Sequence, residues 1–196
     1  MSKIDNLLKF KVFNIISLSD VPFGSKIFPI ISTFLTKRTK ESTPEQEEIE
    51  KCKTRMCLGG HLAIECVHHQ KMDAYAPVPT WATIKLQLAP TSRHKLQLRA
   101  FDCVAAYLQA ELKEPIYTRP PKGIMSELGH NSDKVWEMNR ALYGWPPSGR
   151  IWFDKVSTWV LAYRFRTLGN SGTFMMLDRR EHDDGDKGII LLNLYS

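Results

Sequence analysis

The chain has 196 residues, 43% of them apolar, which is enough to bury a hydrophobic core in one or two domains. Its net charge of +6 favours a polyanionic partner, although a basic soluble protein of no special function has the same balance. The N-terminal segment is interrupted by charges, and no stretch has the ~18 uncharged apolar residues that a membrane span needs. With four cysteines and no secretory signal, we expect a protein of a reducing compartment, cytoplasmic or nuclear, without a membrane partner.

The first predicted strands lie between Val21 and Arg38, where β-branched and aromatic residues are separated by prolines and a glycine. Charged residues dominate from Lys37 to Lys53, and this stretch predicts a solvated loop or a short helix capped by Thr43. Lys53 and Arg55 then alternate with uncharged residues, so on a strand both cations lie on one face. Taken alone, such a pair is most often a solvent-exposed face.

Cysteines and histidines gather in the same region, and they raise the alternative of a small zinc-binding module. The candidate ligands are Cys52, Cys57, His61, Cys66, His68 and His69. Their spacing departs from that of a zinc knuckle at two intervals, so buried or half-buried thiols are the simpler interpretation.

A helix is predicted from Thr80 to Leu88, because Trp81, Ile84 and Leu88 recur at helical spacing and Thr80 can cap the helix. Pro90 should end this helix early or kink it, at a cost of about 3 kcal/mol.

An alternating strand pattern begins at Lys95 and ends at a single carboxylate, Asp102, and the aromatic Tyr107 then begins a short helical run. Phosphoryl transfer with two magnesium ions uses such a carboxylate, because Mg²⁺ takes oxygen ligands from one or two carboxylates and from substrate phosphates. The alternative is an Asp that caps a helix beginning near Val104, with Tyr107 as ordinary core.

The sequence of the last part of the chain predicts four further strands and one long helix. The strands are Ile116–Thr118, Lys134–Met138, Thr173–Leu177 and Gly188–Tyr195. Ser148 can cap the helix, whose Trp152, Val156, Trp159 and Tyr163 form one apolar stripe that we expect in the core. Asp183 and Asp184 precede a Gly between two β-rich runs, so we interpret them as part of a hairpin turn and not as catalytic acids.

Five ordered blocks of the chain resemble the reverse transcriptases of copia-type retrotransposons. The blocks are Lys53–Met56, Ala74–Val78 with the helix after it, Asp102–Leu112, Ile116–Gly123, and Leu142–Gly144 with Arg150 and Trp152. Their common order is far more specific than any one of them. The resemblance implies an α+β fold with polymerase fingers and an incomplete palm, an antiparallel sheet packed on helices.

The resemblance also implies roles for single residues. Asp102 would be a catalytic residue and a ligand of Mg²⁺, the implied cofactor. Lys53 and Arg55 would grip the triphosphate of the incoming nucleotide, and Tyr107 would lie under its sugar and crowd out a 2′-hydroxyl. Tyr143 and Gly144 would complete the substrate site, with Gly144 letting the backbone approach the templating base pair. The partners would be an RNA template and a DNA primer.

The resemblance divides the chain into an N-terminal extension (1–19), a fingers-like region (20–94) and a partial palm (95–196) with an inserted fingers segment at about 118–148. The family's paired acids follow a Tyr at the end of the second palm strand, and this sequence stops at Ser196, directly after Tyr195. We therefore expect a fragment of such a polymerase that is inactive as it stands. A non-catalytic nucleic-acid-binding module and the zinc-binding module are the alternatives.

Overall fold

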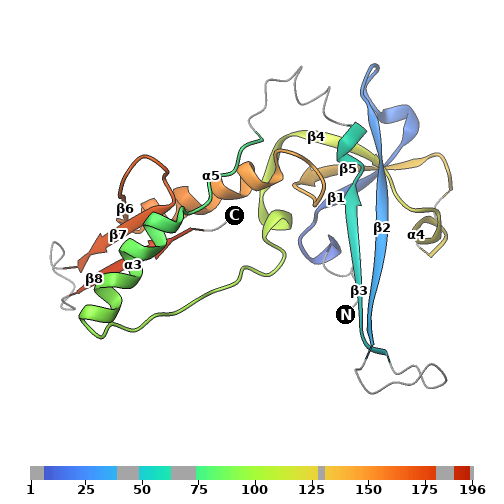
Figure 1. Ribbon diagram of the computed structural model, residues 1–196. Helices are drawn as coiled ribbons and strands as arrows, with labels where there is room; N and C mark the ends of the chain where they lie inside the picture. Colours follow the sequence, from blue (N-terminus) through green and yellow to red (C-terminus); the bar gives the residue numbers. More distant parts are fainter. Residues whose placement is uncertain (1–6, 39–48, 63–73, 128–130, 180–187, 195–196) are drawn as a thin grey trace. The chain divides into compact units, whose positions relative to one another are not determined.

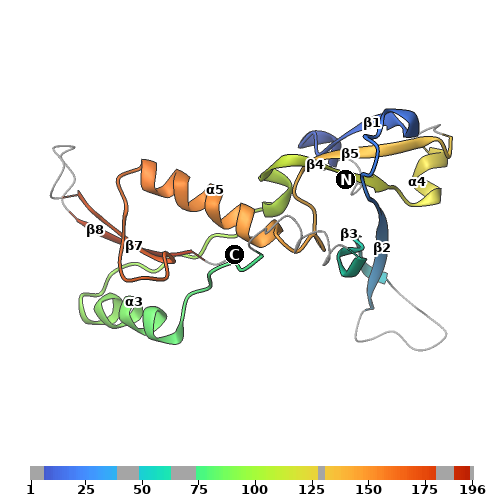
Figure 2. The same ribbon diagram turned by 90° about the horizontal axis from the view of Figure 1, so that it is seen from above.

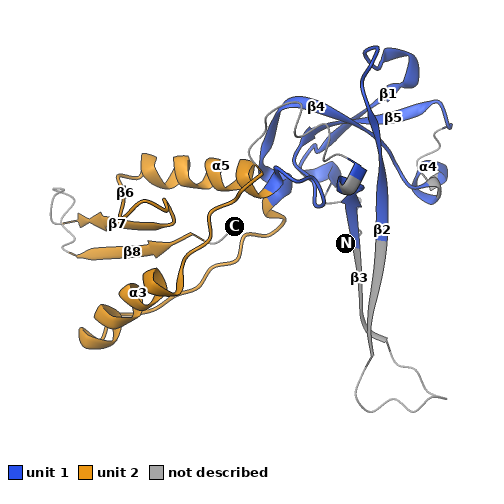
Figure 3. Cartoon of the chain, turned by 45° about the horizontal axis from the view of Figure 1, so that its top comes forward, with its two compact units in different colours: residues 1–72, 107–148 blue, residues 73–106, 149–196 orange. Residues whose placement is uncertain are grey.

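The computed structural model describes residues 7–38, 49–62, 74–127, 131–179 and 188–194. The chain forms two compact units, each built from two separate segments (Figure 3). Unit 1 comprises residues 1–72 and 107–148, and unit 2 comprises residues 73–106 and 149–196. Both units contain sheets and helices, which confirms the predicted α+β class.

A five-stranded sheet with the order β1-β5-β4-β2-β3 forms unit 1 (Figure 1). Its strands are β1 (Phe13–Ser17), β2 (Ile27–Arg38), β3 (Ile49–Leu58), β4 (Glu111–Arg119) and β5 (Lys134–Arg140). Neighbouring strands are antiparallel except β2 and β4, which pair in parallel at the start of β2. The strands predicted from the sequence in this unit are therefore confirmed, and β4 is longer than expected. The helix expected after Thr43 lies outside the described residues.

Aromatic packing holds β1 against β5 in the core of unit 1. The fully buried Trp136 of β5 stacks on Phe13 of β1, with ring centroids 3.9 Å apart and ring planes within 9°. Such a contact adds about 1 kcal/mol to the burial of the two rings. The segment that the sequence suggested as an N-terminal extension thus supplies a strand to this sheet.

Unit 2 is a small antiparallel sheet with a helix on each side. Its strands are β6 (Arg166–Thr167), β7 (Phe174–Asp178) and β8 (Ile189–Asn193), and its helices are α3 (Trp81–Arg93) and α5 (Ser148–Ala162). Figures 1 and 2 show the sheet between the two helices. The Gln87 side chain of α3 donates to the Leu191 carbonyl of β8 at 3.1 Å and accepts from the Asn193 side chain. The predicted pairing of the last two strands is confirmed.

The apolar stripe of α5 is only half buried, so its predicted place in the core is partly wrong. Trp152 is 8% exposed, whereas Trp159 and Tyr163 are 61% and 60% exposed. The ring centroids of Trp159 and Tyr163 are 4.8 Å apart. Val160 in the last turn of α5 is buried at 4% exposure, so the helix packs along its whole length through a face that does not include Trp159 and Tyr163. No helix among the described residues is long and apolar enough to cross a membrane.

Helix α3 begins as predicted but does not end at Pro90. The Thr80 hydroxyl accepts from the Thr83 amide at 3.2 Å, which confirms the cap. The helix continues through Pro90 to Arg93, so the predicted early end is wrong. Pro90 has no N–H to donate to the carbonyl four residues earlier, but its own carbonyl accepts from the His94 amide at 2.9 Å and the helix continues past it.

The C-terminus of α3 is a Schellman motif with a lysine in the left-handed position. The Leu96 amide donates to the Thr91 carbonyl at 2.9 Å, the Lys95 amide donates to the Ser92 carbonyl at 3.3 Å, and Lys95 has φ +50°. Glycine adopts this conformation without the cost of about 1 kcal/mol that an L side chain has there.

We therefore expect Lys95→Gly to raise the free energy of unfolding, by up to about 1 kcal/mol. Thermal unfolding followed by circular dichroism measures the change. The control is Lys85→Gly, which places glycine inside the same helix and should lower stability by about 1 kcal/mol. A lower melting temperature for Lys95→Gly would contradict the motif.

Candidate nucleotide site

Two glycines let the loop after β5 cross the end of β3 in unit 1. Gly144 has φ +84°, and a Cβ on it would lie 2.3 Å from the Leu58 carbonyl oxygen. A Cβ on Gly60 would overlap the Gly144 carbonyl oxygen, at 1.8 Å. The Leu58 amide donates to the Tyr143 carbonyl at 2.7 Å. The two backbones are therefore in direct contact, and the crossing needs glycine at both positions.

Tyr143 and Tyr107 meet beside this crossing, and we call them the tyrosine pair. Their ring centroids are 4.9 Å apart, with ring planes inclined at 46°. Tyr107 lies on η3 (Ala106–Gln109), a 3-10 helix, and its carbonyl accepts from the Ala110 amide at 2.9 Å. Both rings keep access to solvent, since Tyr143 is 39% exposed and Tyr107 is half-buried. The pair thus offers an aromatic surface formed by two segments that are far apart in the sequence.

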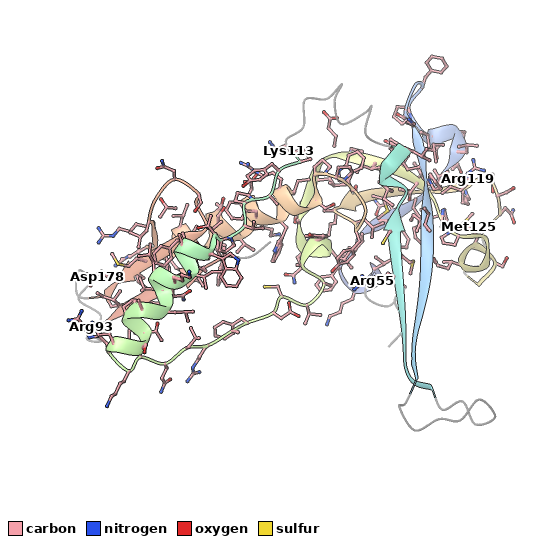
Figure 4. The ribbon with its side chains drawn as sticks, in the orientation of Figure 1. Arg55, Arg93, Lys113, Arg119, Met125 and Asp178 are labelled. Atoms are coloured by element: carbon pink, nitrogen blue, oxygen red, sulfur yellow. The ribbon has the colours of Figure 1, made fainter. Side chains whose placement is uncertain are left out.

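Strand β3 also carries the two basic positions. Lys53 pairs with Leu35 and Arg55 pairs with Thr33 in the β2–β3 register, so the two basic residues occupy one face of the strand. The Arg55 side chain is exposed (Figure 4). Leu58, which contacts the glycine crossing, follows on the same strand. Five of the six predicted site residues therefore belong to unit 1.

Asp102 belongs to unit 2, and the strand predicted to deliver it is wrong. Residues 95–103 have no regular secondary structure, and Asp102 is exposed. Leu96, Leu98 and Phe101 of this segment are 50%, 59% and 85% exposed. An alternating pattern becomes a strand only when a neighbouring strand takes up its hydrogen bonds. The predicted helical run is confirmed as the single turn of η3.

The described residues do not make a magnesium site by themselves. Asp102 offers one exposed carboxylate, and no group of three or more His, Cys, Asp or Glu side chains that could hold a metal occurs in the described part of the chain. A two-metal site needs more carboxylate oxygens than one residue supplies. Of the possible zinc ligands, Cys57 is described as a half-buried free thiol, and the side chains of the other five lie outside the described residues.

The turn that leads from Gly144 into α5 is anchored by Trp145 and Ser148. Trp145 is 5% exposed and contacts Phe28, with ring centroids 5.8 Å apart. The Ser148 hydroxyl donates to the Leu142 carbonyl at 2.7 Å. Ser148 therefore closes the turn and is the first residue of α5, so its predicted role as the cap before that helix is wrong. The two prolines between them fit this turn without breaking it.

Sequence reasoning missed two residues that shape the site: Gly60 and Arg140. Gly60 was visible as part of a Gly-Gly pair after β3, which often marks a close backbone approach. Arg140 forms an ion pair with Glu111 at 3.3 Å, and the sequence held no signal that would bring these two together.

Comparisons with known proteins agree on one family. Residues 11–195 match the family described as reverse transcriptase (RNA-dependent DNA polymerase). The truncated transposon Ty1-A Gag-Pol polyprotein of Saccharomyces cerevisiae is 37% identical over 60 residues, which are 31% of this chain and 5% of that protein. The transposon Ty1-DR4 Gag-Pol polyprotein of the same yeast is 37% identical over 60 residues, 31% of this chain and 3% of that protein.

The match to each relative is thus a small part of that relative's length. No solved structure matches this chain significantly. The family match covers almost the whole chain and agrees with the order of the sequence blocks. The chain therefore belongs to the reverse transcriptase family, as the copia-type sequence blocks predicted.

Proposed function

We propose that unit 1 binds the incoming deoxynucleotide of a template-directed polymerase. The observation that carries this proposal is the contact of Tyr107 with Tyr143 beside the backbone crossing at Gly144. Three blocks of the chain that resemble the family's blocks supply these residues and the basic positions of β3. Membership of the reverse transcriptase family supports a nucleotide as the ligand.

Each part of the site has a matching part of a nucleotide. The Arg55 guanidinium can form two parallel hydrogen bonds with phosphate oxygens, and Lys53 adds a second positive charge. Tyr107 would lie under the sugar and leave no room for a 2′-hydroxyl. Gly144 and the Tyr143 ring would face the base pair, since a residue without a side chain permits close approach. This assignment implies an RNA template and a DNA primer as partners. It also implies that the chain contributes the fingers and part of the palm of the polymerase.

Titration with a deoxynucleoside triphosphate tests the proposal. Tyr107→Ala should weaken binding about tenfold, a change of about 1.4 kcal/mol, and should narrow the preference for deoxyribose over ribose. Tyr107→Phe keeps the ring and should bind as the wild type does. Tyr163→Ala is the matched control, because it removes an exposed tyrosine from unit 2. Equal affinities of wild type and Tyr107→Ala would contradict the proposal.

We also expect no primer extension by a polypeptide of these 196 residues on an RNA template with Mg²⁺. The reason is that two-metal chemistry needs several oxygen ligands close together, and in the described part of the chain no group of three or more His, Cys, Asp or Glu side chains could hold a metal. A radiolabelled primer and gel electrophoresis measure extension. Nucleotide incorporation that disappears in Asp102→Ala would overturn this expectation and would assign catalysis to Asp102.

A nucleic-acid-binding module without catalysis is the second candidate, favoured by the net charge of +6. Binding to a primer–template duplex that weakens with salt is expected of both candidates. Selectivity for deoxynucleoside triphosphates at the tyrosine pair is expected only of the first, so the titration above distinguishes them.

A further inference from the structure

Arg140, the last residue of β5, contacts the end of η3 and the start of β4 in unit 1. One guanidinium nitrogen donates to the Gln109 carbonyl at 3.0 Å, and another lies 3.3 Å from the Glu111 carboxylate. Directly after Arg140, the Ala141 amide donates to the Ala110 carbonyl at 2.8 Å. Three successive residues, 109 to 111, are thus held from the same end of β5.

Arg140 connects the two segments that carry the members of the tyrosine pair. Tyr107 lies two residues before Gln109 and is tied to Ala110 through its own carbonyl. Tyr143 lies three residues after Arg140, where the glycine crossing fixes the backbone. A four-residue 3-10 helix such as η3 has few bonds of its own, so its position depends on external partners. Arg140 supplies such a partner from the strand that leads to Tyr143.

The two contacts of the guanidinium are not equivalent. The Glu111 side chain is 69% exposed, and an ion pair with a partner so open to solvent contributes little. The bond to the Gln109 carbonyl is partly buried, and a charged donor makes it the stronger of the two. Loss of the carbonyl contact should therefore matter more than loss of the ion pair.

We infer that Arg140 is a positioning residue of the nucleotide site, which keeps Tyr107 against Tyr143 and so sets the preference for deoxyribose. The part of this inference that concerns deoxyribose rests on the proposed function, whereas the placement of the two tyrosines does not. Lysine cannot replace Arg140 fully, because an ammonium group lacks the planar fork that reaches two acceptors at once.

Photo-oxidative cross-linking of the tyrosine pair tests the placement without any ligand. Adjacent tyrosines give a fluorescent dityrosine product, which peptide mapping assigns to residues 107 and 143, and Tyr107→Phe gives the baseline. Arg140→Met should lower this cross-link toward the baseline, Arg140→Lys should restore it in part, and Glu111→Gln should keep the wild-type yield. A wild-type cross-linking yield in a folded Arg140→Met would overturn the inference. If circular dichroism shows that Arg140→Met does not fold, the test uses Arg140→Lys, and a wild-type yield in that variant would overturn the inference.

Nucleotide binding by the same variants separates this inference from the proposed function. Arg140→Met should reduce the ratio of deoxynucleoside to ribonucleoside triphosphate affinity as Tyr107→Ala does, whereas Glu111→Gln should leave the ratio unchanged. If the wild type binds neither nucleotide, the proposed function fails while the cross-link still reports on Arg140. If the cross-link falls and the ratio stays constant, Arg140 positions the tyrosines but not the selectivity, and the inference is wrong in that part.

Discussion

Replacing Gly144 with alanine is expected to unfold unit 1. Two independent causes act at this position. An L residue at φ +84° is strained by about 1–2 kcal/mol, and a Cβ would lie 2.3 Å from the Leu58 carbonyl oxygen and 3.0 Å from the Leu58 nitrogen. Leu58 is buried, and its amide is hydrogen-bonded to the Tyr143 carbonyl, so a shift of the strand would cost both the burial and the hydrogen bond. Together these effects should exceed about 4 kcal/mol, a large share of the stability of a typical domain.

Urea unfolding followed by circular dichroism and tryptophan fluorescence measures this loss. Gly60→Ala should behave like Gly144→Ala, because its Cβ would overlap the Gly144 carbonyl. Gly123→Ala is the matched control, since nothing lies within 4 Å of its Cβ and it belongs to α4 (Lys122–Glu127). Its stability should be unchanged or higher by about 0.5 kcal/mol. Similar unfolding midpoints for Gly144→Ala and Gly123→Ala would mean that the two backbones do not cross as described.

Elements with complete local signals could be predicted from the sequence. Helix α3 has apolar residues at helical spacing and a threonine that caps its first turn. The strands β7 and β8 are β-rich runs on either side of an Asp-Gly turn signal, and each pairs with its neighbour in sequence. Such contacts depend on residues that are close in the chain, so the sequence contains nearly all the information that they need.

Elements that depend on distant partners could not be predicted. The alternation before Asp102 resembles that of a strand, but residues 95–103 have no regular secondary structure. Trp159 continues the stripe of Trp152 at helical spacing and is nevertheless 61% exposed, because burial depends on what packs against the helix. In the candidate site, family blocks indicated Tyr107 and Tyr143, whereas their contact and the role of Arg140 follow from strand register.

Removing both basic residues of β3 is expected to weaken binding to a primer–template by about 100-fold, as the second candidate function requires. Each charge-assisted bond to a phosphate contributes about 1.5–3 kcal/mol, so Lys53→Ala with Arg55→Ala should cost at least about 3 kcal/mol. The affinity of the variant should also depend less on the salt concentration. For a single-stranded nucleic acid, each lost phosphate contact lowers the slope of log affinity against log salt by about 0.7. Fluorescence anisotropy with a primer–template bearing a single-stranded overhang, repeated across salt concentrations, measures both changes.

The control is Lys113→Ala with Arg119→Ala, which removes the same charge from two exposed positions on β4 of the same sheet (Figure 4). If affinity depends only on the net charge of +6, both double variants should lose the same amount. If β3 makes direct contacts, the β3 variant should lose about tenfold more affinity than the β4 variant and show the flatter salt dependence. Equal losses would mean that Lys53 and Arg55 make no direct contact with the primer–template phosphates, because a general electrostatic attraction does not depend on which strand carries the charge.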